Sequence, residues 1–191
     1  MDVASPSQPS PLLASALASG DYRLDQEGAP KPYKPAADAE VRATVLEVLA
    51  NLAHGHLSTV TADGWPVGCG VRYVSLDDGT GRPVIYLISG LAQRELVNID
   101  RDSRVSFEAH YAVGFERRRE AKGVQLQGVA SLVSDEQELA FVSPQAQAKY
   151  NDPEVMQRKQ VARIDVLSAV VFNASGRPQW GQFDYFAQQD G

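Results

Sequence analysis

The chain has 191 residues, a length that fits one domain with an appended tail better than two domains. Its formal charge is −6, from 24 acidic and 18 basic side chains, which argues against a nucleic-acid-binding protein because such proteins usually carry a basic surface. Cys69 is the single cysteine, which excludes an internal disulfide and fits a reducing compartment. No apolar run approaches the roughly 20 residues that span a bilayer, and the first residues show neither the basic start nor the continuous apolar stretch that is typical of a secretory signal. We therefore expect a soluble, cytoplasmic protein without membrane contact.

The N-terminal segment differs in composition from the rest of the chain. Residues 1–37 are rich in Pro, Ser and Ala and carry little apolar periodicity. They are expected to form a disordered or surface-draped tail, with an arm that wraps a partner subunit as the alternative. Residues 38–191 are expected to form one domain. It begins with a helix over residues 39–53, capped by Asp38, whose apolar side chains recur at helical spacing and make one buried face.

After this helix the apolar pattern changes to the period of a strand. Residues 56–62 and 67–74 are predicted to form two strands joined by a tight turn at Asp63-Gly64. On the second strand the apolar residues share one face, while the other face carries Gly68 and Gly70. Two glycines on one face leave the backbone open to close approach by a flat or bulky ligand, with a bulge or a barrel bend as the alternative.

The next segment carries the most informative pattern. Residues 84–88 are continuously apolar, as in a strand buried on both faces, and a helix over residues 89–99 is expected to follow with Ser89 as its N-cap. A helix N-terminus favours an anion because its backbone N–H groups are unpaired, and Arg94 can donate further hydrogen bonds to phosphate oxygens. The segment therefore predicts a phosphate site. The alternative is that Ser89 only caps the helix and Arg94 pairs with Glu95 or another surface acid.

The remaining pattern indicates more short strands. A further helix is expected at residues 135–150, interrupted near Pro144. About six or seven strands with helices at the sides predict a mainly β protein, an antiparallel barrel that leaves few exposed edges. The later strands are expected at residues 104–111, 124–133, 161–173 and 180–186.

The sequence offers no catalytic constellation. His54 and His56 lie two residues apart, but no third ligand follows at a recognisable spacing, so we expect no metal site. Cys69 lies on the apolar face of its strand and is interpreted as a core residue. Without a Walker loop, a G-x-S-x-G motif or a dinucleotide-binding glycine pattern, the catalytic residues stay unassigned. Such a chain fits a protein whose bound redox cofactor supplies the chemistry.

Short motifs follow one another in a characteristic order. They are Asp63-Gly64-x-Pro66, Ser89, Gln93-Arg94-Glu95, Asn98-Ile99, Arg104-Val105-Ser106-Phe107 and Gly128-x-Ala130. Their order and spacing resemble the pyridoxamine 5′-phosphate oxidase-like, FMN-binding split-barrel superfamily. The resemblance covers residues 40–135 well and the remainder loosely. It implies a split β-barrel with flanking helices, of six to seven antiparallel strands, and a homodimer that holds FMN in clefts at the subunit interface.

The resemblance also assigns residues to the cofactor. Ser89 falls at the hydroxyl that contacts the phosphate region, and Arg94 falls at the phosphate-binding arginine. Gln93 stands where the family has a serine before that arginine. The remaining implied contacts, along the flavin and from a C-terminal aromatic that reaches the partner's flavin site, are Val71, Arg72, Tyr73 and Trp180.

Two positions depart from the family pattern. Glu95 replaces a lysine and would place a negative charge near the phosphate, and Cys69 replaces an arginine. The family's C-terminal Arg-x-His is not visible, which argues against the vitamin-B6 reaction. We therefore expect an FMN-dependent oxidoreductase acting on an unidentified small-molecule substrate. The alternatives are the same barrel with F420 or haem, the latter suggested by His54, His56 and His110, or a non-catalytic dimeric binding protein with a decayed flavin site.

Overall fold

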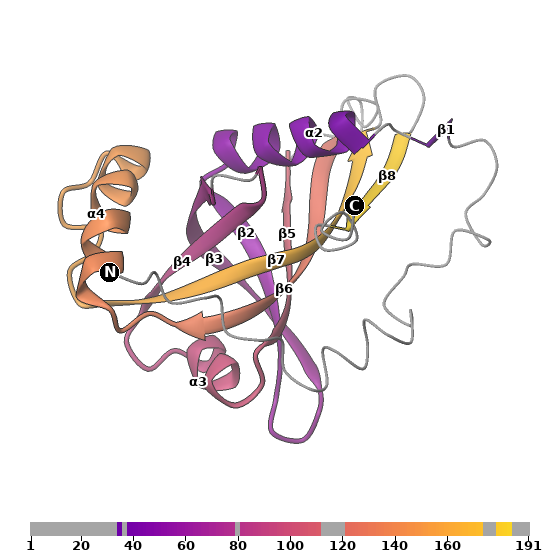
Figure 1. Ribbon diagram of the computed structural model, residues 1–191. Helices are drawn as coiled ribbons and strands as arrows, with labels where there is room; N and C mark the ends of the chain where they lie inside the picture. The colour runs from indigo at the N-terminus through magenta and orange to yellow at the C-terminus, as the bar shows by residue number, and fades with distance from the viewer. Residues whose placement is uncertain (1–33, 36–37, 79–80, 112–120, 174–178, 185–191) are drawn as a thin grey trace, which may run out of the picture. The chain divides into compact units, whose positions relative to one another are not determined.

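The computed structural model describes residues 34–35, 38–78, 81–111, 121–173 and 179–184 (Figure 1). In these residues a β-barrel is covered at one end by helix α2, at the other by α3 and on one side by α4 (Figure 1). The helices are α2 (Asp38–Asn51), α3 (Arg94–Arg101) and α4 (Glu136–Tyr150). The strands are β1 (Lys34–Pro35), β2 (His54–Val60), β3 (Pro66–Asp77), β4 (Pro83–Gly90), β5 (Arg104–His110), β6 (Lys122–Leu132), β7 (Lys159–Asn173) and β8 (Gln179–Asp184).

Within the described residues, six of the strands close into a ring. Their order is β7-β4-β3-β2-β5-β6, and β6 pairs back to β7. Every pairing in the ring is antiparallel. The long strand β7 makes the closure possible, since one of its edges pairs with β6 while the other pairs first with β4 and then with β8. The predicted antiparallel split barrel is confirmed.

The core lies inside the barrel and beneath α2. The α2 residues that face it are fully buried, as the helical spacing predicted: Val41, Val45, Val48 and Leu49. Inside the barrel the rings of Tyr73 and Phe107 meet edge to face, with centroids 4.9 Å apart. Gly55 permits this packing, because a Cβ atom there would lie 2.3 Å from the Phe107 ring. Burial of these apolar side chains is the main source of stability at this end.

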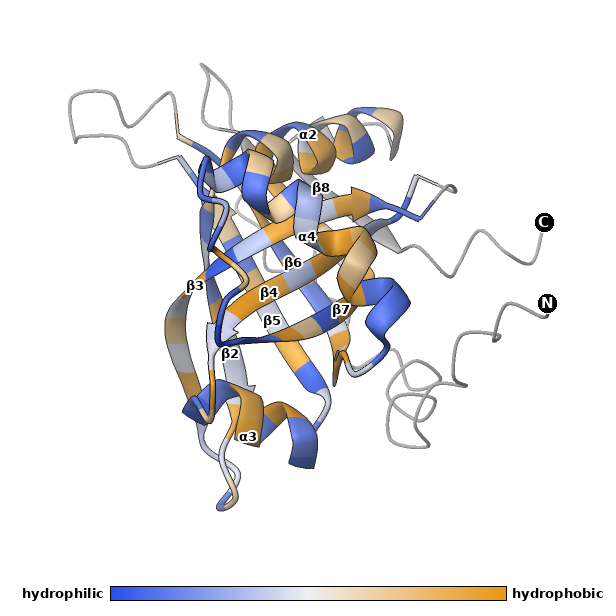
Figure 2. Ribbon diagram, turned by 90° about the vertical axis from the view of Figure 1, so that its left-hand side faces the viewer, coloured by the Kyte–Doolittle hydropathy of each residue, from blue (hydrophilic) through white to orange (hydrophobic). Residues whose placement is uncertain are grey.

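Strand β4 is buried on both faces, as its continuous apolar sequence predicted. One face points into the barrel, and the other packs under α4, which lies along this side of the barrel (Figure 2). Helix α4 continues through Pro144, so the predicted interruption there is wrong. Pro144 lacks the N–H that would bond the Ala140 carbonyl. Both residues are exposed, so the proline ring and this carbonyl can face solvent. Burial of Val142 and Ala146 on the opposite side offsets the cost of the missing hydrogen bond.

The helix after β4 begins later than predicted. Ser89 lies inside β4 and pairs with Gln160 of β7. Helix α3 begins at Arg94, with Gln93 as its N-cap residue, so the prediction that Ser89 caps the helix is wrong. The physical reason is long-range: β7 supplies ladder hydrogen bonds that hold Ser89 in the sheet, and a local capping pattern cannot reveal that partner.

Some expectations concern residues outside the described ones. Almost all of the segment 1–37 lies outside them, so the tail and the domain boundary stay predictions. The backbone of Trp180 pairs with Phe172 across β7 and β8, and the expected role of its side chain stays a prediction. In the described part of the chain, no helix is long and apolar enough to cross a membrane.

Candidate functional site

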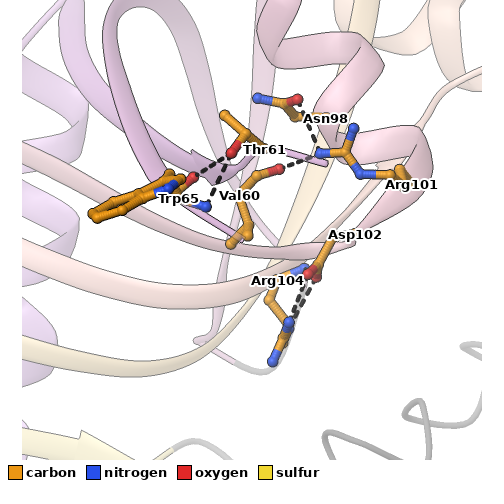
Figure 3. Close-up of polar contacts among 7 residues, drawn as sticks. All are labelled: Val60, Thr61, Trp65, Asn98, Arg101, Asp102 and Arg104. Carbon is orange, nitrogen blue, oxygen red and sulfur yellow. Dashed lines mark hydrogen bonds and ion pairs between the residues drawn. The ribbon is translucent and has the colours of Figure 1, made fainter. Parts of the chain in front are cut away.

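Helix α3 is tied to the barrel by hydrogen bonds near its C-terminal end, and Figure 3 shows those of Arg101. The Asn98 amide donates to the Thr59 hydroxyl at 2.9 Å, and both side chains are buried. The Arg101 guanidinium donates to the Val60 carbonyl oxygen at 2.5 Å and to the Asn98 amide oxygen at 3.1 Å. Leu96 adds a buried apolar contact from the middle of the helix. These contacts fix the direction of α3 and therefore the position of its N-terminus.

A further hydrogen bond joins the first turn of α3 to the barrel. The Ser89 side chain shares a strand face with Ile85 and Leu87, which point into the core, and it is nearly buried itself. Its hydroxyl donates to the Glu95 carboxylate at 2.5 Å. The hydroxyl that the sequence predicted for a phosphate is therefore bound by a carboxylate of the same chain.

The N-terminus of α3 carries no side-chain cap. Gln93 occupies the N-cap position in an extended conformation, and its side chain makes no capping hydrogen bond. Ala92 precedes it with a φ of 56°, in the left-handed region that costs free energy for a residue other than glycine. Arg94 is exposed and has no hydrogen bond or ion pair with the residues that the structure describes. Helix N–H groups and a guanidinium are thus available together to an anion.

Cys69 lies close enough to α3 to sense its charges. Burial raises the pKa of the Cys69 thiol, and the Glu95 carboxylate raises it further, while Arg94 lowers it. A thiol with a raised pKa is a poor nucleophile at neutral pH. The interpretation of Cys69 as a core residue therefore agrees with its surroundings, and Cys69, Arg94 and Glu95 come together at this end of the barrel.

The outer face of β3 is open beside this helix. Among the residues that the structure describes, a Cβ atom at Gly70 would meet no atom within 4 Å, and one at Gly68 would make only ordinary contacts. The β2–β3 ladder is regular from His54↔Arg72 to Val60↔Pro66, so the two glycines mark no bulge. They leave room above the sheet, next to the strand end where β4 leads into α3.

The histidines gather on the same outer face. His56 pairs with Gly70 across β2 and β3. Its ring stacks with that of His110 from β5, with centroids 6.2 Å apart and planes 13° apart. His110 Nδ1 lies 3.2 Å from Glu108 Oε1. No group of three or more His, Cys, Asp or Glu side chains among the described residues could hold a metal ion.

The residues predicted to lie along a flavin separate between the two faces of β3. Val71 and Tyr73 point into the core, and the Tyr73 hydroxyl donates to the Leu49 carbonyl at 3.0 Å. The Tyr73 backbone N–H donates to the Tyr150 hydroxyl at 2.7 Å. Arg72 is exposed on the outer face, and its guanidinium lies 5.4 Å from the centre of the Tyr150 ring. Of these three β3 side chains, Arg72 is the one that faces the open surface.

Sequence reasoning missed two features of this region. One is Tyr150, which satisfies the β3 backbone from 77 residues away and had no local signal. The other is the pairing of His56 with Gly70, which depends on the loop length of the predicted hairpin. A two-residue turn at Asp63-Gly64 would have set His56 opposite Val71. The observed loop is one residue longer, with the Thr61 N–H donating to the Trp65 carbonyl, and this shifts the register so that His56 lies opposite Gly70.

The donors at the α3 end fit the phosphate of FMN in part. The uncapped helix N-terminus and Arg94 suit an anion, and the open face at Gly70 has room for a flat ring system. Glu95 opposes the fit, because its carboxylate binds the Ser89 hydroxyl and repels a second anion. The residues present can therefore hold the group, and Glu95 limits how tightly.

Known proteins resemble the chain over different lengths. The chloroplastic glutamyl-tRNA reductase-binding protein of Arabidopsis thaliana is 39% identical over 82 residues, which make up 43% of this chain and 23% of that protein. The match therefore spans less than a quarter of that relative. A conserved hypothetical protein of Mycobacterium tuberculosis superposes with a TM-score of 0.58 at 22% identity, covering 80% of this chain and 91% of that one. A heme binding protein of Mycobacterium smegmatis gives 0.55 at 24% identity, covering 77% and 58%.

The likeness to the two mycobacterial structures shows the fold alone. The family model described as pyridoxamine 5′-phosphate oxidase matches residues 41–171, from α2 through most of β7. That range holds the closed barrel, the open glycines and the α3 end. The chain therefore belongs to the pyridoxamine 5′-phosphate oxidase family.

Proposed function

We propose that the protein binds FMN and acts as a flavin-dependent oxidoreductase on a small-molecule substrate. One observation carries this proposal: Arg94 is exposed, has no hydrogen bond or ion pair among the described residues and lies at the uncapped N-terminus of α3, where its charge acts on Cys69, the neighbour of the open Gly70 on β3. A fixed helix N-terminus with an adjacent guanidinium is suited to a phosphate, and an unfilled strand face is suited to an aromatic ring system.

In this proposal, different residues bind the phosphate and the ring system of FMN. Arg94 and the first N–H groups of α3 hold the phosphate, with Gln93 and Ser89 at its edge. The glycine face and Arg72 border the ring system, while Val71 and Tyr73 support the strand from inside the core. When bound, FMN supplies the hydride transfer. The protein contributes position and charge.

A homodimer belongs to the same proposal. The outer face of β2, β3 and β5 carries exposed polar side chains and open glycines, and no other element of the described chain lies over Gly70. A second copy against this face would close the ring site, and its Trp180 would reach the flavin as the family pattern implies. Light scattering of the purified protein should give twice the mass of one chain, and a monomer in the presence of FMN would contradict this part.

The test of the proposal is a flavin titration. FMN fluorescence is followed as wild type, Arg94→Ala and Arg42→Ala are added, Arg42 being an α2 residue at the other end of the barrel. Loss of the charge-assisted hydrogen bonds should weaken binding of the Arg94→Ala protein by about 1.5–3 kcal/mol, roughly 10- to 150-fold, with no change for Arg42→Ala. Equal FMN affinities of wild type and Arg94→Ala would show that Arg94 does not contribute to the site. If the wild type does not bind FMN, FMN is not its cofactor.

Haem is a second candidate, favoured by the pairing of His56 with His110 on the open face. The fold likeness to a protein named as heme binding adds support. Imidazole is a common axial ligand of haem iron, and these rings lie beside Gly70, where a macrocycle would have room. Added haemin should then give a sharp Soret band that His56→Ala or His110→Ala shifts. An unchanged band in both variants would exclude the pair as ligands, and a parallel titration with F420 tests the deazaflavin.

A non-catalytic binding role is the remaining candidate. It is favoured by the hydrogen bond that commits Ser89 to Glu95, and by the name of the Arabidopsis relative, which describes a binding protein of glutamyl-tRNA reductase. A colourless protein that takes up none of the three cofactors but retains purified glutamyl-tRNA reductase on a column would support it. Failure to retain that enzyme would count against it.

A further inference from the structure

We infer that Glu95 sets how strongly this site discriminates a phosphorylated ligand from its unphosphorylated counterpart. The inference rests on the proposed FMN site and concerns the charge balance within it. Its basis is the contact between the Ser89 hydroxyl and the Glu95 carboxylate at 2.5 Å, one residue from Arg94.

Glu95 weakens phosphate binding in two ways. The Ser89 hydroxyl has one proton, and it is donated to Glu95, so it cannot also be donated to a phosphate oxygen. The carboxylate also adds a negative charge to a site where Arg94 supplies the positive one, and this charge repels the phosphate. Both effects act on a phosphate group and leave an uncharged ribityl chain untouched.

The contact is not needed to hold α3 in place. The helix is fixed independently by the Asn98 bond to Thr59 and by the Arg101 bond to the Val60 carbonyl. Leu96 and Ile99 bury its apolar side in the core. Removing the charge of Glu95 therefore changes the ligand site without releasing the helix that forms it.

The experiment compares two flavins that differ only by the phosphate. FMN and riboflavin are titrated against wild type, Glu95→Gln and Ser89→Ala, with Glu47→Gln as the control because Glu47 is an exposed α2 carboxylate paired with Lys122. Glutamine keeps the shape of Glu95 and removes its charge. In the Glu95→Gln protein FMN should bind about tenfold tighter, with riboflavin affinity unchanged. Ser89→Ala should leave FMN affinity within about twofold of wild type, because the hydroxyl already serves Glu95.

The outcomes separate this inference from the proposed function. If Glu95→Gln and wild type bind FMN equally, or if neither binds it, the inference is overturned. An equal gain for riboflavin and FMN overturns it as well, because Glu95 would then act on the shape of the loop. If Glu95→Gln binds FMN and wild type does not, the inference stands and FMN is removed as the native ligand.

Discussion

The two ends of the barrel are closed in different ways. At the α2 end the seal is apolar, with fully buried side chains from the helix over the rings of Tyr73 and Phe107. At the α3 end the contacts are mixed: Leu96 and Ile99 are buried, and hydrogen bonds from Asn98 and Arg101 also hold the helix. Figure 3 shows those of Arg101.

The polar groups at the two ends differ in whether they are engaged. At the α2 end the Leu49 carbonyl accepts hydrogen bonds from the Tyr73 hydroxyl at 3.0 Å and from Lys149 Nζ at 3.2 Å, so the helix C-terminus is satisfied from within. At the α3 end the N-terminus has no side-chain cap and Arg94 has no partner in the described part of the chain. The α2 end is built for stability, and the α3 end retains the groups that a ligand needs.

The largest effect is expected from a cavity at the α2 end. Leu49→Ala should lower the free energy of unfolding by about 2–5 kcal/mol, because Leu49 is fully buried and its neighbours cannot fill the space. FMN affinity of the folded fraction should not change, since the site lies at the other end. Urea unfolding measures the first quantity and fluorescence titration the second. The matched control is Leu46→Ala, an exposed position on the same helix, which should cost at most about 1 kcal/mol.

The next effect belongs to the α3 end. Asn98→Ala should cost about 1–3 kcal/mol, because it leaves the buried Thr59 hydroxyl without its donor. Combining it with Thr59→Val removes both polar groups, so the double variant should lose less than the sum of the two single losses. Additive losses in urea unfolding would show that the hydrogen bond does not couple the two positions.

The sequence predicts those features of the two barrel ends that depend on interactions between residues close together in the chain. The strand faces follow from alternation within a few residues, which is why Val105, Phe107 and Ala109 of β5 are buried as predicted. The apolar face of α2 follows from spacing within four turns of helix. Both are local patterns that burial in any fold would enforce.

The features that the sequence did not predict depend on distant partners. Ser89 belongs to the sheet because Gln160 pairs with it, 71 positions further along the chain. That pairing delays the start of α3, and the delay puts the Glu95 carboxylate against the Ser89 hydroxyl. Sequence proximity correctly placed Ser89, Arg94 and Glu95 close together. That Ser89 is hydrogen-bonded to Glu95 while Arg94 is available to a ligand follows only once the pairing of β4 with β7 is known.

A pH dependence follows from the buried ammonium at the α2 end. Burial lowers the pKa of Lys149 from 10.5 to about 8, and its Nζ lies 4.0 Å from the centre of the Tyr73 ring. Because the folded pKa is below the unfolded one, the unfolded state binds more protons between pH 8 and 10.5, and this group adds stability as the pH rises through that window. The gain should stay below about 1.4 kcal/mol per pH unit, since solvent still reaches the side chain.

Other groups titrate in the opposite direction in the same window. Burial raises the pKa of the Cys69 thiol and of the Tyr73 and Tyr150 hydroxyls, so their contributions are lost as the pH rises. The measurement is therefore a difference: urea midpoints of wild type and Lys149→Gln at several values from pH 7 to about pH 9.5. The urea midpoint of the wild type should rise relative to that of Lys149→Gln as the pH increases. If the two midpoints change in parallel with pH, Lys149 does not cause the dependence.

The smallest effect is expected from an exposed ion pair beside α3, and it tests whether burial separates the polar contacts of that end. Arg104 Nη2 lies 2.6 Å from Asp102 Oδ2, with the Arg104 side chain 53% exposed. Arg104→Gln should cost only about 0.2–1 kcal/mol, less at high salt, because water screens the pair. Its hydrogen bond lowers the pKa of Asp102, so the contribution should also fade as the pH drops through that lowered value. If Arg104→Gln lowered the free energy of unfolding as much as Asn98→Ala, burial would not explain which polar contacts stabilise α3. The buried Asn98–Thr59 hydrogen bond would then contribute no more than an exposed ion pair.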